Sequence, residues 1–278
     1  MLLVRMTGGL GNQMYCYALY RTLLERGRDV YMDLSYYCHQ NNPNVDIREY
    51  ELSKVFNITE RTMKMSELKY FFMRIARRLK VPGLVGLYQE KEGGFSSNMK
   101  VFNIKNGILD GYWQSFKYSA EIENILRKEF TFKRVPTGEA AELLNKVCNC
   151  NSVSMSIRRG DYLKWNGSLT EGYYINAINY IQERVPNAKF FCVSDGIDYC
   201  KNTYGGRGYD IYFVKCPPDN NSYDMQLISQ CKHNILANST FSIWGAWLNQ
   251  NPGKIVIRPE NLYPIIYYDT EDWIIINS

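Results

Sequence analysis

Hydrophobic and polar residues alternate most clearly in the second half of the chain. Within residues 152–157, Val153, Met155 and Ile157 alternate with serines, which is the period-two pattern of a β-strand. Further strands are predicted near 189–194, 210–214, 234–237 and 254–258, and helices near 173–185, 197–204, 222–231 and 242–250. This alternation of strands and helices predicts a doubly wound parallel sheet.

The first half begins as a similar unit. Residues 2–6 predict a strand, the glycine-rich stretch 7–12 follows it, and residues 13–25 predict a helix before a second strand at 30–33. Residues 34–117 are less regular, and helices are predicted near 118–129 and 138–147. We therefore expect two α/β units in close contact, residues 1–149 and 150–278.

Two adjacent arginines follow the strand predicted near 153–157. Arg158 lies on the strand face of Ser156 and Arg159 on the opposite face, so the two are expected to differ in role. Ligands of open α/β sheets bind at the carboxyl ends of the strands, and guanidinium groups there suit a diphosphate. We expect one arginine to reach the ligand and the other to pack or pair, with Asp161 as a candidate partner. The alternative is a solvated turn with a surface arginine–aspartate pair.

The loop from Gly8 to Gln13 stands between a strand and a helix, where backbone amides can approach an anion. It lacks the third glycine of a dinucleotide-binding motif, because Met14 occupies that position. Asp33, which follows Gly11 by 22 residues, nevertheless resembles a ribose-binding acid and keeps an NAD(P)-dependent oxidoreductase as an alternative. A tight turn without a ligand is the other alternative.

Two further strand ends carry groups that suit an anion. Residues 238–242 place three hydroxyls at the start of a predicted helix, which can cradle a phosphate or simply cap the helix. Asp195 ends the strand at 189–194 as a ligand-edge carboxylate or a helix cap. Together, the three strand ends predict an enzyme that holds a nucleotide diphosphate.

The composition narrows the function classes. An apolar content of 45%, with 23 tyrosines and 12 phenylalanines, is globular, and a net charge of +5 favours small anionic ligands over nucleic acid. The eight cysteines form no CxxC pair and only two histidines are present, so we expect no zinc site and reduced thiols in a cytoplasmic protein. The N-terminus predicts a strand and not a signal peptide, and no apolar run reaches the roughly 18 residues of a membrane span.

Residues 61–80 hold the densest group of basic side chains, interspersed with apolar ones. This pattern predicts a basic amphipathic helix. Such a helix can lie on the anionic inner face of a membrane, and peripheral contact there is one expectation for this segment. The solvated face of an ordinary surface helix is the commoner alternative. The sequence does not predict an oligomeric state.

Five motifs, read together in order and spacing, resemble those of the bacterial α-1,2-fucosyltransferases of glycosyltransferase family 11. They span 8–14, 110–115, 156–162, 191–195 and 227–258. The resemblance implies a GT-B-like fold of two Rossmann-type lobes with the active site in the cleft between them. It implies GDP-β-L-fucose bound mainly by the C-terminal lobe, a galactose-containing glycan acceptor bound mainly by the N-terminal lobe, no cofactor, and inverting, metal-independent transfer to a galactose 2-hydroxyl for surface polysaccharide or lipopolysaccharide synthesis. A non-catalytic nucleotide-sugar or glycan-binding protein of the same fold is the further alternative.

The resemblance also implies roles for individual residues. Arg158 resembles the arginine on the β-phosphate, Asp224 an aspartate that reads guanine, and Asn12 the asparagine that faces the reacting sugar in the more distant protein O-fucosyltransferases. Where the family has a histidine before the arginines, this chain has Ser156. The flanking arginines should depress the pKa of Asp161, so we expect it to orient an arginine, and the general base stays unassigned. The catalytic set is Arg158, Asn12 and Asp161; the donor-binding set is Gly9, Gly11, Gln13, Ser156, Arg158, Asp195, Asp224, Ser239, Thr240 and Phe241.

Overall fold

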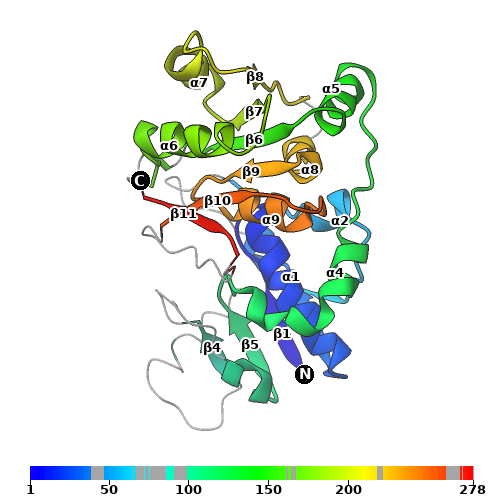
Figure 1. Cartoon of the computed structure of the whole chain (residues 1–278). Helices are drawn as coiled ribbons and strands as arrows, with labels where there is room; N and C mark the ends of the chain where they lie inside the picture. The colour runs from blue at the N-terminus through cyan, green and yellow to red at the C-terminus, as the bar shows by residue number, and fades with distance from the viewer. Residues whose placement is uncertain are drawn as a thin grey trace. The chain divides into compact units, whose positions relative to one another are not determined.

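The computed structural model consists of two compact units, Met1–Lys133 and Arg134–Ser278 (Figure 1). The described residues are 1–38, 47–64, 66, 72, 75, 86–90, 99–160, 162–163, 167–217, 222–260, 270 and 272–277.

The first unit is built on a five-stranded sheet in the order β3-β2-β1-β5-β4. Every pairing in it is parallel. The strands are β1 (Leu2–Arg5), β2 (Val30–Asp33), β3 (Thr62–Met63), β4 (Leu87–Gln89) and β5 (Gly107–Asp110). The helices are α1 (Leu10–Glu25), α2 (Leu52–Val55) and α4 (Glu123–Glu129), with 3₁₀ turns η1 (Ser35–Cys38), η2 (Met99–Asn103), η3 (Phe116–Tyr118) and η4 (Ala120–Ile122).

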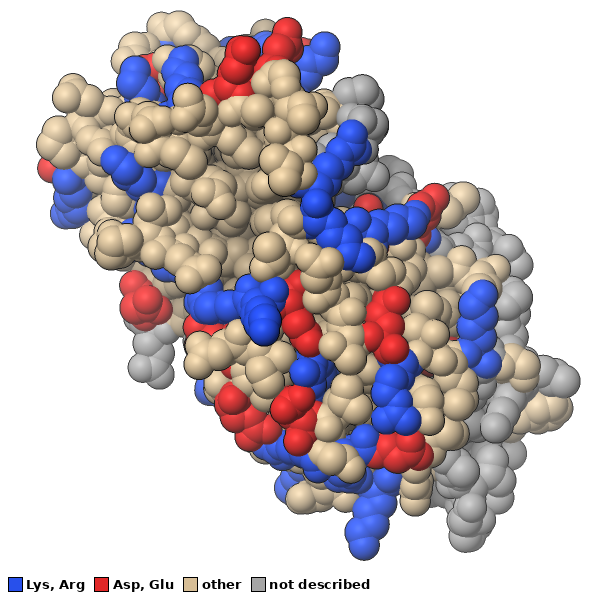
Figure 2. All heavy atoms as spheres, turned by 90° about the vertical axis from the view of Figure 1, so that its right-hand side faces the viewer, with Lys and Arg blue, Asp and Glu red and all other residues tan. Residues whose placement is uncertain are grey.

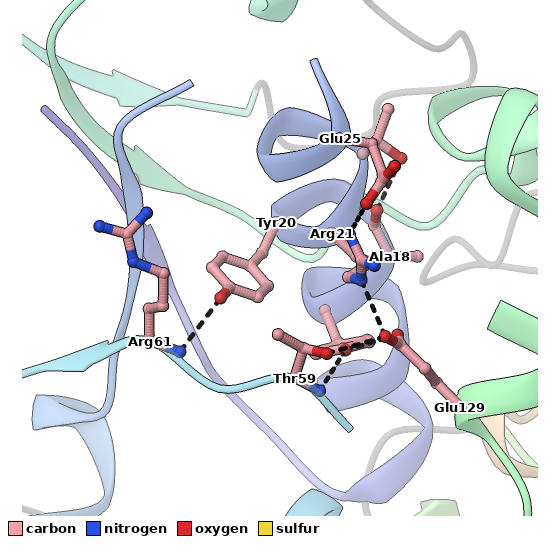
Figure 3. A network of polar contacts seen from close by, with 9 residues as sticks. Ala18, Tyr20, Arg21, Glu25, Thr59, Arg61 and Glu129 are labelled. Atoms are coloured by element: carbon pink, nitrogen blue, oxygen red, sulfur yellow. Dashed lines mark hydrogen bonds and ion pairs between the residues drawn. The ribbon is translucent and has the colours of Figure 1, made fainter. Parts of the chain in front are cut away.

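Helix α1 is the central helix of this unit, and most of its side chains are buried. Its Arg21 pairs with Glu129 of α4 at 2.9 Å between Nε and Oε1, and also with Glu25 (Figure 3). The Tyr17 hydroxyl donates to the other oxygen of Glu129 at 2.6 Å, and the Thr59 hydroxyl donates to Oε1 at 3.0 Å. Glu129 therefore ties α1, α4 and the segment after α2 into one polar network, and its charge raises the pKa of Tyr17 further than burial alone.

The second unit contains a six-stranded sheet in the order β11-β10-β9-β6-β7-β8, again with parallel pairings. The strands are β6 (Ser152–Ile157), β7 (Lys189–Ser194), β8 (Ile211–Phe213), β9 (His233–Ile235), β10 (Val256–Pro259) and β11 (Ile274–Ile276). The helices are α5 (Gly138–Cys148), α6 (Glu171–Gln182), α7 (Ile197–Tyr204), α8 (Tyr223–Gln230) and α9 (Thr240–Leu248).

Two hydrophobic cores cover the two faces of this sheet. Val153, Met155 and Ile157 of β6 pack with the buried faces of α6 and α7. Residues of α5 and α8 pack with Phe191 and Val193 of β7 in the other core. All six residues of β6 are buried, as expected for a central parallel strand covered on both sides.

A buried polar network joins β9 to β6, to α8 and to Asn249, the residue that follows α9. The Asn234 side chain, with no exposed surface, donates from Nδ2 to Ser154 Oγ at 2.9 Å and to the Ile228 carbonyl at 2.8 Å. Its Oδ1 accepts from Asn249 Nδ2 at 2.8 Å. Because every one of these groups is satisfied by another, the network stabilises one packing of α8 and α9 on the sheet.

Asn234→Ala is expected to destabilise the protein by about 1–3 kcal/mol, because it removes the donor to the buried Ile228 carbonyl and one of the two acceptors of the Asn249 amide, which keeps the Cys231 carbonyl. Urea unfolding followed by circular dichroism measures this loss. Asn202→Ala on the exposed side of α7 is the matched control and is expected to change the midpoint little. Equal midpoints for the two variants would show that the network does not carry this stability.

The fold prediction of two α/β units with parallel sheets is confirmed. The units divide after Lys133, whereas the sequence placed the boundary at 149–150. The difference is helix α5, which packs on the second unit: Val147 joins its core and Tyr223 donates to the Ala140 carbonyl at 2.9 Å. In the stretch that looked irregular, Leu87–Gln89 form strand β4 and Gly107–Asp110 form strand β5.

The surface charges are mixed. On the face drawn in Figure 2, basic and acidic side chains of the described residues lie interspersed, which gives that face no strong field of one sign. Thr62–Met63, at the start of the predicted basic helix, form strand β3, and most of residues 64–80 lie outside the described residues. Among the helices that the structure describes, none has the length and apolar character needed to cross a bilayer.

Candidate active site

Each sheet has one point at which the strand order reverses. In the second unit β6 is followed by β7 and β8 on one side, and β9 and β10 lie on the other, so the reversal falls between β6 and β9. In the first unit it falls between β1 and β5. Ligands of open α/β sheets bind beyond the carboxyl ends of the strands at such points. The segments after β6, β9, β1 and β5 are therefore the candidate site segments.

Arg158 and Arg159 leave β6 in different directions. The Arg158 guanidinium pairs with Asp195, at 2.7 Å between Nη1 and Oδ2, and keeps 30% of its side chain exposed. The Arg159 guanidinium instead lies 3.6 Å from the centre of the Tyr199 ring on α7. The difference expected from the strand alternation thus appears in the contacts: Arg158 is at the ligand edge, and Arg159 packs on a helix.

Asp195 holds the start of this arginine segment. Besides pairing with Arg158, it accepts the backbone N–H of Arg159 at 2.7 Å. It does not cap α7: Gly196 is the N-cap residue, and the Ser194 hydroxyl accepts the Gly196 N–H at 3.0 Å. Asp161, the partner expected for an arginine, lies outside the described residues.

Two buried polar atoms beside the reversal point have no partner within the described part of the chain: Ser156 Oγ and Asn238 Oδ1. Ser156 is 5% exposed and Asn238 2% exposed. An unsatisfied buried oxygen is costly, so each one calls for a ligand group or a water to complete it. The expected donor set included Ser156 and left out Asn238, because the lack of a partner for Asn238 is visible only in three dimensions.

The N-terminus of α9 follows Asn238. Ser239 is the N-cap residue, and its hydroxyl accepts the Phe241 N–H at 3.3 Å. Thr240 is the first helical residue and is half-buried, while Phe241 packs against the core formed by α5, α8 and β7. The hydroxyl of Ser242 is turned inward, donating to the carbonyls of Ala237 and Ser239. The segment therefore caps its own helix: the Ser239 N–H donates to the Ala237 carbonyl at 2.8 Å and the Phe241 N–H to the Ser239 hydroxyl.

Asp224 lies in the first turn of α8. Burial raises the pKa of its carboxyl to about 6, and a hydrogen bond with the Cys216 side chain acts in the opposite direction. A carboxylate that has lost water and has no cationic partner among the described residues is prepared to accept N–H groups from a ligand.

In the first unit, α1 begins at Leu10, earlier than expected, so Asn12 and Gln13 lie in its first turn. Gln13 is fully buried. Its Nε2 donates to the carbonyls of Gly8 and Glu49, and its Oε1 accepts from the N–H groups of Glu51 and Leu52. All four hydrogen bonds of the amide are thus used. Gln13 therefore fixes the segment before α2, and its contact with the donor stays a prediction.

Gly9 is the N-cap of α1, and Gly11 is buried inside the helix; neither has a positive φ. The glycine that the turn requires is Gly8, with φ +72°, where a Cβ would lie 2.6 Å from Asn12 Nδ2. Asn12 Oδ1 accepts from Gln114 Nε2 at 3.0 Å. The loop after β1 and the motif after β5, far apart in the sequence, therefore meet at the reversal point of the first sheet.

Asp33 does not offer its carboxylate to a ribose. It has no exposed surface, and its two oxygens accept the N–H and the hydroxyl of Ser35, at 3.0 and 2.9 Å. The aspartate closes a turn after β2. The feature that favoured a nicotinamide cofactor is therefore structural.

A search of the described residues finds no group of three or more His, Cys, Asp or Glu side chains that could hold a metal ion. The eight cysteines are free thiols.

The model of "Glycosyl transferase family 11" matches residues 50–272 of this chain. The chain is 34% identical over 268 residues to an alpha-1,2-colitosyltransferase of Escherichia coli, covering 92% of this chain and 90% of that protein. It is 31% identical over 300 residues to the O-antigen biosynthesis glycosyltransferase WbnK of Escherichia coli, covering 93% of each. A crystal structure of NodZ alpha-1,6-fucosyltransferase soaked with GDP-fucose aligns with a TM-score of 0.49 at 12% identity, over 89% of this chain and 91% of that one. The chain belongs to glycosyl transferase family 11 and is a glycosyltransferase.

Proposed function

We propose that this glycosyltransferase moves L-fucose from GDP-β-L-fucose to the 2-hydroxyl of a galactoside in a surface glycan. Family membership supports the reaction class, and the related O-antigen glycosyltransferase supports the glycan. The observation that carries the donor site is the partly exposed cation Arg158 at the reversal point of the second sheet, where Ser156 and Asn238 have oxygens without a partner among the described residues.

In this proposal, the second unit binds GDP. Arg158 contacts the β-phosphate, and the start of α9 at Ser239, Thr240 and Phe241 lies against the diphosphate. Asp195 orients Arg158 until the phosphate competes for it. Asp161 is also proposed to orient an arginine.

Asp224 is proposed to accept the N1–H and N2–H groups of guanine. Adenine offers an acceptor at its N1, so the same carboxylate disfavours ADP.

Departure of GDP places negative charge on the β-phosphate while positive charge develops on the sugar ring. Arg158 and the oriented N–H groups of α9 stabilise the departing diphosphate, so the site needs no metal ion for this charge. The acceptor hydroxyl attacks from the opposite face of the sugar, which converts the β-linked donor into an α-linked product.

The first unit is proposed to bind the acceptor, through the segments after β1 and β5 that carry Asn12 and Gln114. The donor contacts expected of Gly9 and Gly11 stay predictions. A position on the cytoplasmic side of a membrane, with residues 61–80 in peripheral contact with anionic lipid, stays a prediction.

Colitose is the second candidate for the transferred sugar, because one relative is an alpha-1,2-colitosyltransferase. Colitose is L-fucose without its 3-hydroxyl. A site that hydrogen-bonds this hydroxyl rejects the deoxy sugar strongly, whereas an apolar contact there discriminates only weakly. Comparing kcat/KM for GDP-fucose and GDP-colitose decides between them.

The purified protein is expected to transfer fucose from GDP-fucose to N-acetyllactosamine, and to keep most of this activity in excess EDTA, because Arg158 and backbone N–H groups neutralise the diphosphate. Chromatography of the products measures the transfer. Activity that vanishes in EDTA and returns with magnesium or manganese would contradict metal independence, and absence of transfer with both GDP-fucose and GDP-colitose would contradict the function.

A further inference from the structure

The segment after β4 places a carboxylate at the edge where the acceptor is proposed to bind. β4 pairs with β5, with Gln89 opposite Asp110, and the Glu90 N–H donates to the Asp110 carbonyl at 2.9 Å. Glu90 therefore lies directly beside the Asp110–Ser115 motif, one strand away from the reversal point between β1 and β5.

One oxygen of Glu90 anchors the turn that carries this motif. Oε2 accepts the N–H groups of Tyr112 and Trp113, at 2.9 and 2.8 Å. A Cβ on Gly111 would lie 2.7 Å from Oε2, so the glycine permits this approach. Trp113 has φ +55°, a strained conformation for a large side chain that the two hydrogen bonds help to hold.

The anchoring leaves the carboxylate basic. Its partners are neutral amides, and among the described residues Glu90 forms no ion pair. Asp110, the neighbouring carboxylate, lies 3.8 Å from the guanidinium of Arg5 and keeps 15% exposure. Burial raises the pKa of Glu90, with the two backbone N–H groups acting in the opposite direction. The raised pKa of Glu90 suits a group that accepts a proton.

The surroundings of Glu90 suit a sugar. Tyr112 is 48% exposed beside it, and its aromatic ring offers an apolar face to sugar C–H groups. Trp113 is fully buried and stacks on Tyr88, with ring centres 6.0 Å apart, which makes the support rigid. At the same edge of the sheet, Asn12 and Gln114 hydrogen-bond each other and present amide groups.

We propose that Glu90 is the general base of the transfer reaction, with its Oε1 accepting the proton of the acceptor hydroxyl. This rests on the proposed function. The hydroxyl oxygen forms a bond to the anomeric carbon of the donor sugar as the bond between that carbon and the β-phosphate oxygen breaks. GDP leaves with the bonding electron pair, and Glu90 later releases the proton to water.

Glu90→Gln tests this role, because the amide oxygen can still accept the N–H groups of Tyr112 and Trp113 while its proton affinity is lost. The variant is expected to lower kcat for transfer to N-acetyllactosamine by about a hundredfold or more, the usual contribution of a general base. Slow hydrolysis of GDP-fucose without acceptor, GDP affinity and melting temperature are expected to stay within about twofold or a few degrees of wild type. Glu90→Asp, which keeps a carboxylate but shortens it, is expected to retain more kcat than Glu90→Gln.

The matched control is Glu49→Gln, an exposed glutamate of the same unit that pairs with Lys54 at 2.6 Å. It is expected to leave all these quantities unchanged. A wild-type kcat in Glu90→Gln would overturn the role of Glu90 as base. So would a variant whose hydrolysis rate falls as much as its transfer rate and whose melting temperature also drops. If the wild-type protein turns over neither GDP-fucose nor GDP-colitose, the proposed function is contradicted. If the wild type is active and Glu90→Gln is equally active, only the role of Glu90 is contradicted.

Discussion

Arg158→Ala is expected to lower kcat for fucosyl transfer by about a hundredfold to a thousandfold, equivalent to about 2.7–4 kcal/mol of transition-state stabilisation. The physical reason is the charge on the departing GDP. Arg158 is the guanidinium on the ligand side of β6, and it keeps 30% of its side chain exposed despite its pair with Asp195. A charge-assisted contact that strengthens as the leaving-group charge grows affects kcat more than KM.

Arg159→Ala is the matched control, because it removes the same group one residue later. Its guanidinium stacks on Tyr199 of α7, so the variant is expected to lower the melting temperature and to reduce kcat much less. Steady-state kinetics beside a circular-dichroism melt separates the two effects. If Arg159→Ala abolished turnover and Arg158→Ala only lowered stability, the roles assigned to the two faces of β6 would be reversed.

Asp224→Ala is expected to weaken GDP binding by about 1.5–3 kcal/mol, roughly a factor of ten to a hundred and fifty, and to reduce the preference for GDP over ADP. The carboxylate is desolvated and lies in the first turn of α8. Calorimetric titration with both nucleotides measures the change. Asp198→Ala, at an aspartate of α7 with 90% exposure, is the control and is expected to bind both as the wild type does.

The same residue gives GDP binding a pH dependence. Because the carboxyl of Asp224 has a pKa of about 6 in the unliganded protein, GDP affinity is expected to fall as the pH drops below 6, since the protonated acid accepts guanine poorly. Asp224→Ala is expected to remove this dependence.

Stability of the unliganded protein changes with pH in the opposite direction to GDP affinity. The pKa of the Asp224 carboxyl in the folded protein is raised above the ordinary 3.8, so its protonation stabilises the fold at low pH. This contribution is lost as the pH rises through about 6. If Asp224→Ala binds GDP with the affinity, the preference over ADP and the pH dependence of the wild type, another group recognises guanine.

Period-two alternation was enough to predict β6, because Val153, Met155 and Ile157 face one continuous core. It was not enough for β4 and β5. These strands have three and four residues, too few to establish a period, and their pairing depends on partners far away in the sequence.

The helix starts were predicted late for a physical reason. α1 and α9 begin at glycine-rich or hydroxyl-rich segments that look like loops, and in both cases the apolar pattern starts after the cap.

In the candidate site, too, features of a local motif were predicted and features that depend on distant residues were not. The arginines and hydroxyls at strand ends were visible in the sequence because each belongs to a local motif. The role of Gln13 was not, since its four partners include residues 49–52. Arg158 pairs with Asp195, which follows the neighbouring strand β7, and the lack of a partner for Asn238 among the described residues appears only after packing. Glu90 was missed because nothing local distinguishes it before β4 pairs with β5.

The most direct measurement is the structure of the product formed from GDP-β-L-fucose and N-acetyllactosamine by the purified protein. Two-dimensional NMR of the isolated trisaccharide reports both the anomeric configuration and the attachment point of the new sugar. We expect an α-anomeric fucose whose H1 correlates with C2 of galactose. A β-linked fucose, or attachment at any other hydroxyl, would contradict inverting transfer to the galactose 2-hydroxyl.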